Sequence, residues 1–90
     1  MLDTANRVTI PLALRKLSNL KNEEKVYVAW ESDQILFIPF TSGDVSGHKI
    51  FDVRKIDDKG RIVLPTPFVK LSSDWTVYLL DGEIWATRCA

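Results

Sequence analysis

An internal repeat constrains the fold of this 90-residue chain more than any other feature of its sequence. Residues 3–11 (DTANRVTIP) align with residues 57–65 (DDKGRIVLP) at a constant offset of 54 positions, and the Asp, Arg and Pro are identical. The three residues between the Arg and the Pro are β-branched or aliphatic in both copies, which favours a strand. The chain is therefore expected to fold as two similar units.

Each copy begins with a predicted turn, which runs from Asp3 to Asn6 in the first copy and from Asp57 to Gly60 in the second. An Asp that opens a turn usually accepts a hydrogen bond from the backbone two residues further on. Asn and Gly both tolerate a positive φ angle, Gly because it lacks a Cβ atom. We therefore expect all four residues to have structural roles in two tight turns.

The similarity continues beyond the proline and predicts the order of the elements. A short helix is expected after Pro11, with Leu12, Leu14 and Leu17 as its apolar face, and a weaker counterpart around 66–71. β-Branched and aromatic residues predict strands at about 7–10, 26–30, 35–40, 48–56, 61–64, 75–80 and 83–88. Seven short strands with one or two single-turn helices indicate a mainly β fold with short helices, such as a small barrel.

The composition excludes several classes of protein. The chain is 46% hydrophobic and has no apolar run of about 20 residues, so no membrane helix is expected. Polar residues at positions 3, 6 and 7 interrupt the N-terminus where a secretory signal would be apolar. Cys89 is the one cysteine, so an intracellular location is expected. The single histidine, His48, belongs to no metal-ligand spacing and no nucleophile–base set, so we expect no metal, no cofactor and no catalysis.

The charge is balanced overall but unevenly distributed. Twelve basic residues match twelve acidic ones, which counts against a nucleic-acid partner. Residues 5–25 and residues 49–70 nevertheless each carry a net charge of +3. The compensating acidic residues gather near two other predicted turns, at Glu31 and Asp33 and at Asp81 and Glu83. We therefore expect a dipolar molecule with a basic face and an acidic opposite end.

The segment 54–65 (RKIDDKGRIVLP) closely resembles the AbrB/MazE/MraZ-like DNA-binding domains, also called SpoVT-AbrB domains. The resemblance covers most of the chain as two copies, and it implies a swapped-hairpin (double-split) β-barrel built from two AbrB-like repeats. The first repeat would be residues 1–40, with its leading strand truncated, followed by a linker at 41–47 and the second repeat at 48–90. Two units in one chain are most similar to MraZ or to a fused AbrB dimer, and we expect them to form one barrel.

The resemblance also implies a prokaryotic, cytoplasmic regulator of transcription that contacts double-stranded DNA through basic hairpin and helix residues. In such domains arginines act on the strand before the turn, directly after the turn and on the following helix. The corresponding residues of this chain are Arg7, Arg15, Lys16, Arg54, Lys55, Arg61 and Lys70. Two departures stand out, because the first copy lacks the leading strand and Val69 replaces the basic residue equivalent to Arg15.

Each of these residues also has a structural alternative. The arginine after each turn can pair with the turn aspartate instead of a phosphate, and only one of Arg54 and Lys55 can face outward from a strand. The three tryptophans, at positions 30, 75 and 85, are expected in the core or an interface. The alternative function is a barrel that no longer binds DNA and acts as a protein-interaction or oligomerisation module, including antitoxin-like partner binding. Because one strand is missing, a homodimer is expected unless strand 48–56 fills the gap.

Overall fold

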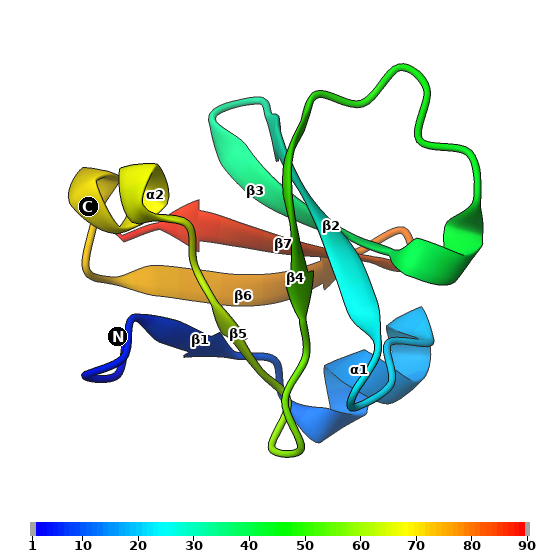
Figure 1. The fold of residues 1–90 in the computed structure, drawn as a ribbon, viewed down its shortest axis with the longest axis horizontal. Helices are drawn as coiled ribbons and strands as arrows, with labels where there is room; N and C mark the ends of the chain where they lie inside the picture. The colour runs from blue at the N-terminus through cyan, green and yellow to red at the C-terminus, as the bar shows by residue number, and fades with distance from the viewer. Residues whose placement is uncertain (1, 90) are drawn as a thin grey trace.

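In the computed structural model, which describes residues 2–89, both copies contain a short strand, a short helix and then a pair of strands, and the second copy has one further strand before this series (Figure 1). The first copy contains β1 (Arg7–Thr9), α1 (Leu12–Ser18), β2 (Lys25–Glu31) and β3 (Gln34–Pro39), followed by the 3₁₀ helix η1 (Phe40–Ser42). The second copy contains β4 (Ile50–Lys55), β5 (Arg61–Val63), α2 (Thr66–Leu71), β6 (Trp75–Leu80) and β7 (Glu83–Arg88). The predicted mainly β fold with short helices is confirmed.

The strands form two antiparallel sheets. One sheet has the order β4-β2-β3-β7-β6, and the other contains β1 and β5. Within residues 2–89 the two sheets are not joined by strand pairing into one closed barrel. β1 pairs with β5, and β3 pairs with β7, so two of the pairings join a strand to its counterpart in the other copy. An approximate two-fold axis therefore relates the copies.

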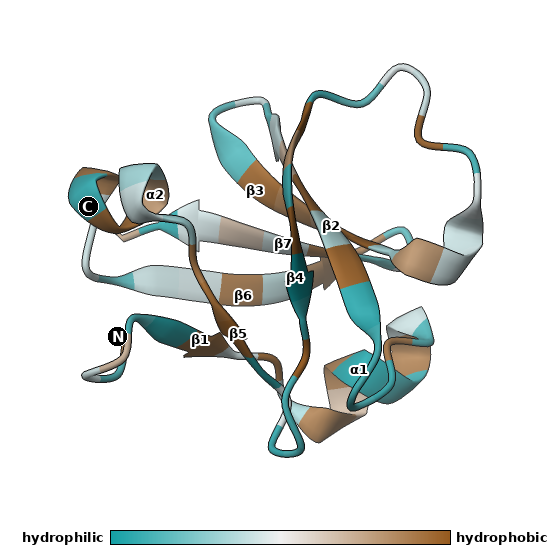
Figure 2. Cartoon of the chain, in the orientation of Figure 1, coloured by the Kyte–Doolittle hydropathy of each residue, from teal (hydrophilic) through white to brown (hydrophobic). Residues whose placement is uncertain are grey.

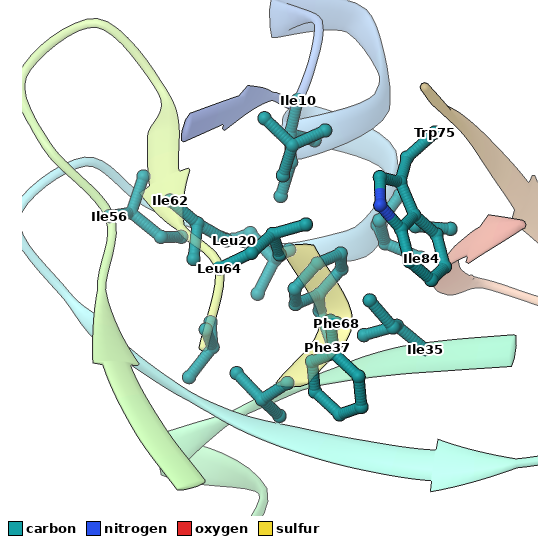
Figure 3. Close-up of a cluster of buried hydrophobic side chains, with 14 residues drawn as sticks. Ile10, Leu20, Ile35, Phe37, Ile56, Ile62, Leu64, Phe68, Trp75 and Ile84 are labelled. Carbon is teal, nitrogen blue, oxygen red and sulfur yellow. The ribbon is translucent and has the colours of Figure 1, made fainter. Parts of the chain in front are cut away.

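The main core lies between the two sheets and the helices (Figure 3). Ile62 of the small sheet and Ile10, which directly follows β1, are fully buried, and so are Ile35 and Ile84 of the large sheet. Trp75 is also buried there, which agrees with a core position for this tryptophan. Burial of this apolar surface stabilises the fold by roughly 25 cal/mol per Å².

A second, smaller cluster lies on the outer face of the large sheet. It consists of Ala29, Leu36 and Ile38, with Trp85 and Val45 packed against it. Val45 belongs to the segment 41–47, which was expected to be a linker. This segment therefore packs on part of the large sheet. The linker thereby closes a face that would otherwise expose apolar side chains to water.

Two predictions about the elements are wrong in detail. The apolar face expected on α1 is only partly used, because Leu12 and Leu17 are 55% and 68% exposed while Leu14 packs against the core. β4 begins at Ile50, because the N–H of His48 donates to the Val45 carbonyl in a turn (3.1 Å).

Strand β4 does not pair with β6, so it does not fill the gap that the truncated first repeat was expected to leave. It pairs with β2, so β6 has only β7 as a neighbour within the described residues. Hydrophilic residues gather at the turn between β4 and β5, whereas β2, β3 and β5 carry hydrophobic stretches (Figure 2). No helix in the described part of the chain has the length and apolar character to cross a membrane.

Candidate nucleic-acid interface

The turn of the second copy is closed by Asp57. One carboxylate oxygen, Oδ1, accepts hydrogen bonds from the backbone N–H groups of Lys59 (2.9 Å) and Arg61 (2.8 Å). The other, Oδ2, accepts one from the Nε of Arg61 at 2.7 Å. Gly60 ends the turn with a φ of 77°, a conformation that costs glycine no steric strain.

The turn of the first copy repeats this geometry. The Oδ1 of Asp3 accepts hydrogen bonds from the N–H groups of Ala5 and Arg7, both at 2.9 Å, and Oδ2 accepts one from the Nε of Arg7 at 2.7 Å. Asn6 takes the place of Gly60 with a φ of 59°. Both aspartates therefore act within their own turns, and both arginines are held by a carboxylate.

These hydrogen bonds lower the pKa of each aspartate. For Asp3 the largest cause is the hydrogen bond from the Arg7 N–H. For Asp57 desolvation is the largest single effect and raises the pKa, but the hydrogen bonds from the Arg61 and Lys59 N–H groups, together with the side-chain hydrogen bond and the charge of Arg61, lower it by more in total. The Nη1 of Arg7 also lies 3.8 Å from Asp57 Oδ2, so an arginine of the first copy reaches the aspartate of the second. Arg7 and Arg61 are thus mainly structural, and part of their charge is neutralised.

Arg15 fixes helix α1 of the first copy to the turn of the second. Its Nε donates to the Ile10 carbonyl at 2.9 Å, and its Nη1 donates to the side-chain oxygen of Asn22. The Nδ2 of Asn22 in turn donates to the Asp58 carbonyl at 2.8 Å. A Cβ atom on Gly60 would lie 2.5 Å from the Arg15 guanidinium carbon, so only glycine leaves space for this contact.

Several cationic side chains lie around Arg15. We name this region the basic turn surface, and it consists of Arg15, Lys16, Lys21, Asn22, Lys55 and Lys59. A depression of about 410 Å³ beside α1 is lined by Arg15, Lys16 and Lys21, together with two leucines and two asparagines. Lys59 stands on the turn itself, and Lys55 precedes it and pairs with Glu23 (2.9 Å). Within residues 2–89 no ion pair is recorded for the three lysines at positions 16, 21 and 59, so these charges are available to an anion.

Two of the predicted residues lie elsewhere or face differently. Arg54 is half-buried, pairs with Asp52 (3.0 Å) and lies opposite the buried Val26 in the strand register, whereas Lys55 is exposed. Of these two neighbours, Lys55 is therefore the one that faces outward. Lys70 is exposed on α2, which lies on the other side of the molecule from α1 (Figure 1).

Sequence reasoning missed three polar contributors to the basic turn surface, namely Lys21, Asn22 and Lys59. Lys21 and Lys59 were counted in the net charge of their segments, but their positions beside α1 could not be read from the repeat. Asn22 has no equivalent in the repeat alignment, and its bond to Asp58 crosses from one copy to the other.

The expected separation of charge into two ends is not what the structure contains. Glu83 lines a small depression together with Ser18 of α1, so the acidic turn between β6 and β7 lies beside the C-terminal end of that helix. Asp33 pairs with Arg88 of the neighbouring strand β7. The acidic residues are spread along the large sheet because its strand order, and not the sequence, decides where each turn lies.

Other kinds of site find little support in the described residues. The Nδ1 of His48 contacts the carboxylate of Glu31, so this histidine is in a side-chain contact between the segment that follows the linker and β2. Among residues 2–89 no three His, Cys, Asp or Glu side chains come close enough together to hold a metal ion. A comparison of the chain with protein-family models, with curated proteins and with solved structures finds no significant match.

Proposed function

We propose that this chain is a DNA-binding regulator of transcription of the AbrB type, which binds duplex DNA through the basic turn surface. The proposal includes the swapped-hairpin arrangement of two AbrB-like repeats. Two features support it: β1 of the first copy pairs with β5 of the second, and α1 of the first copy is fixed to the turn of the second through Arg15. Contacts of this kind are expected where the hairpins of two copies interlock.

The observation that carries the DNA-binding proposal is the depression beside α1, where Arg15, Lys16 and Lys21 converge. Phosphate contacts by lysine and arginine supply most of the affinity for duplex DNA and do not depend on its sequence. The two asparagines of the depression, Asn19 and Asn22, add hydrogen-bonding groups at the same place. Sequence preference would then come partly from the shape and deformability of the DNA.

Within residues 2–89 we expect the basic turn surface to occur once, because Val69 is the residue that aligns with Arg15 in the second copy. A single chain therefore offers one strongly basic surface and, at Lys70 on α2, a weaker second one. We expect the affinity of one chain for DNA to be modest and to depend steeply on salt.

A titration of the full chain with a fluorescently labelled duplex, followed by anisotropy at several salt concentrations, tests the proposal. Lys16→Gln should weaken binding and reduce the slope of log K against log salt by about 0.9, the value for one phosphate contact. The matched control is Lys49→Gln, which removes the same charge from an exposed lysine at the start of β4, away from α1. Equal effects of the two substitutions would contradict the proposed interface.

A second candidate function is favoured by one observation. An apolar groove of about 430 Å³ is lined by aromatic and aliphatic residues of β2, β4 and α2, among them Trp30, Phe51, Phe68 and Leu71. Phe51 and Leu71 are about half exposed, and an exposed apolar surface of this kind often marks a protein interface. If the chain does not bind duplex DNA even at low salt, a protein-interaction module becomes the better explanation.

A further inference from the structure

The free edge of β6 distinguishes it from its counterpart β2. β2 is paired on both sides, with β3 and with β4, whereas β6 pairs with β7 alone within residues 2–89. The remaining strands of the described chain are already occupied, because β1 pairs with β5 and β4 pairs with β2. An unpaired edge carries a row of backbone N–H and C=O groups that can pair with another strand.

The sequence of β6 contains none of the features that usually block edge pairing. The strand reads WTVYLL, without charge or proline, and its pairing with β7 runs through six residues without a bulge. β4, the opposite edge of the same sheet, differs in both respects. It contains Asp52, Arg54 and Lys55, and its register with β2 shifts between Val28 and Ala29.

The hairpin turn between β6 and β7 determines which backbone groups face the free edge. Leu80 and Glu83 flank a two-residue turn, and in such a pair the N–H of each residue donates to the C=O of the other. Hydrogen-bonded and non-hydrogen-bonded pairs alternate along the two strands. The N–H and C=O groups of Trp75, Val77 and Leu79 therefore point away from β7, toward the free edge. β2 follows the same rule, because the N–H of Trp30 points to the β4 side and donates to the Lys49 carbonyl (3.0 Å).

We propose that the free edge of β6 pairs with β6 of a second copy of this chain, antiparallel, with Val77 on the two-fold axis. The outward-facing backbone N–H and C=O groups of one copy must pair with those of the other. Val77 therefore lies opposite Val77 of the second copy, and Trp75 lies opposite Leu79 of the second copy. Two copies then share one continuous sheet of ten strands. The same surface on both copies is self-complementary, as a two-fold interface requires.

The side-chain pairs in this register are favourable. Thr76 faces Tyr78 of the second copy, Val77 faces Val77, and Trp75 faces Leu79, all of which are β-branched, aromatic or aliphatic combinations that stabilise antiparallel pairs. The N–H of Leu2 donates to the Ser73 carbonyl (3.0 Å), so the free edge begins after Ser73. Asp74 lies opposite Leu80 in this register, so it does not face an acidic residue of the second copy. Val77 and Leu79 are partly buried against the core, so pairing extends the apolar layer across the axis.

Sedimentation equilibrium of the full chain over a range of concentrations tests the association, and a monomer–dimer equilibrium is expected. Thr76→Lys should weaken dimerisation about tenfold, because two Thr–Tyr pairs are lost at once. The control is Thr87→Lys, because Thr87 faces Thr76 on β7, a strand that is paired on both sides. Circular dichroism of both variants establishes that they are folded.

Disulfide cross-linking tests the register. With Cys89→Ser to remove the native thiol, Thr76→Cys/Tyr78→Cys should form a covalent dimer on oxidation, because the non-hydrogen-bonded pair brings the two Cα atoms within disulfide reach. Tyr78→Cys alone should not form a covalent dimer, because position 78 faces Thr76 of the second copy and not a cysteine. Cross-linking by the single variant, a dimer that Thr76→Lys leaves unchanged, or the mass of one chain at every concentration would each overturn the proposal. In the last case the edge is left to a strand of a different protein.

Discussion

The two turns of this molecule share one mechanism of closure but differ in what packs on them. In both, an aspartate binds two backbone N–H groups and the guanidinium of the arginine that starts the next strand. At the turn of the second copy, Gly60 leaves room for Arg15 of the first copy. At the turn of the first copy, the equivalent residues are Asn6 and Val69 of the second copy. The two turns therefore differ both in the Cβ atom at the left-handed position and in the side chain that the helix of the other copy offers.

This difference concentrates positive charge on one side of a molecule whose net charge is zero. Val69 packs against the core, whereas Arg15 brings a guanidinium to the surface beside Lys16 and Lys21. A repeat can therefore preserve its backbone in both copies while only one copy builds a binding surface.

Removing the carboxylate of the second turn should cause the largest loss of stability. Asp57→Ala deletes two backbone hydrogen bonds and the pair with Arg61, and it also removes the contact with Arg7 of the other copy. We expect a drop of several degrees in the thermal midpoint, larger than that of Asp3→Ala, which loses only contacts within its own turn. Thermal unfolding of the two variants side by side measures the difference, and equal midpoints would show that the contact between the copies contributes nothing.

Substituting the glycine of the second turn should have the next largest effect. Gly60→Ala places an L residue at a φ of 77° and displaces the Arg15 guanidinium, which together cost about 2 kcal/mol in the free energy of unfolding. Gly82→Ala is the matched control, because Gly82 also has a φ of 77° but has nothing within 4 Å of the added Cβ atom. In urea denaturation, the control should lose only the free energy of unfolding that the strained φ costs, about 1 kcal/mol. A control that loses as much as Gly60→Ala would mean that Arg15 plays no part.

Acid should destabilise the fold through the turn aspartates. The pKa values of Asp3 and Asp57 are lowered in the folded state, so the unfolded chain binds more protons at acidic pH and stability rises with pH in that window. The contribution is complete above about pH 4, the ordinary range of Asp, and is lost as the pH falls through the lowered folded values. Midpoints recorded from pH 6 downward should fall less steeply for Asp57→Ala than for the wild type. Parallel curves would exclude Asp57 as a source of the acid sensitivity.

Converting the first turn into a copy of the second should have the smallest effect. Asn6→Gly/Val69→Arg reproduces the Gly60–Arg15 combination, and under the proposed function it should strengthen DNA binding by a fewfold and raise the salt slope by about 0.9. Val69→Arg without the glycine is the control, because the Cβ atom of Asn6 then stands where the guanidinium would lie. An unchanged slope in the double variant would restrict DNA contact to the basic turn surface alone.

Much of the fold could be predicted because its determinants are local. The Asp-to-Arg turns, the strands that follow them and the helices after Pro11 and Pro65 depend on φ preferences and hydrogen bonds between residues a few positions apart. The alignment of Asn6 with Gly60 predicts a left-handed residue in each turn, and both residues have a positive φ.

The candidate site could be predicted only in part. The sequence predicts Arg15 and Lys16. Lys21 and Asn22 of the same copy line the depression with them only in the folded chain, and the bond from Asn22 to Asp58 holds the turn that carries Lys59 of the second copy beside them. Arg54 and Lys55 could not be separated until the register with β2 placed Arg54 opposite Val26. The distribution of acidic turns depended in the same way on the strand order of the large sheet.

By itself, the sequence determined that the chain contains two similar units, each with an aspartate-closed turn, a short strand and a short helix, because these features follow from side chains acting on nearby backbone. Only the tertiary structure decided that α1 docks on the turn of the other copy and that β6, within residues 2–89, pairs with β7 alone. The physical reason is that the docking and strand pairing that join the copies depend on long-range packing, and identical local patterns are compatible with more than one such arrangement.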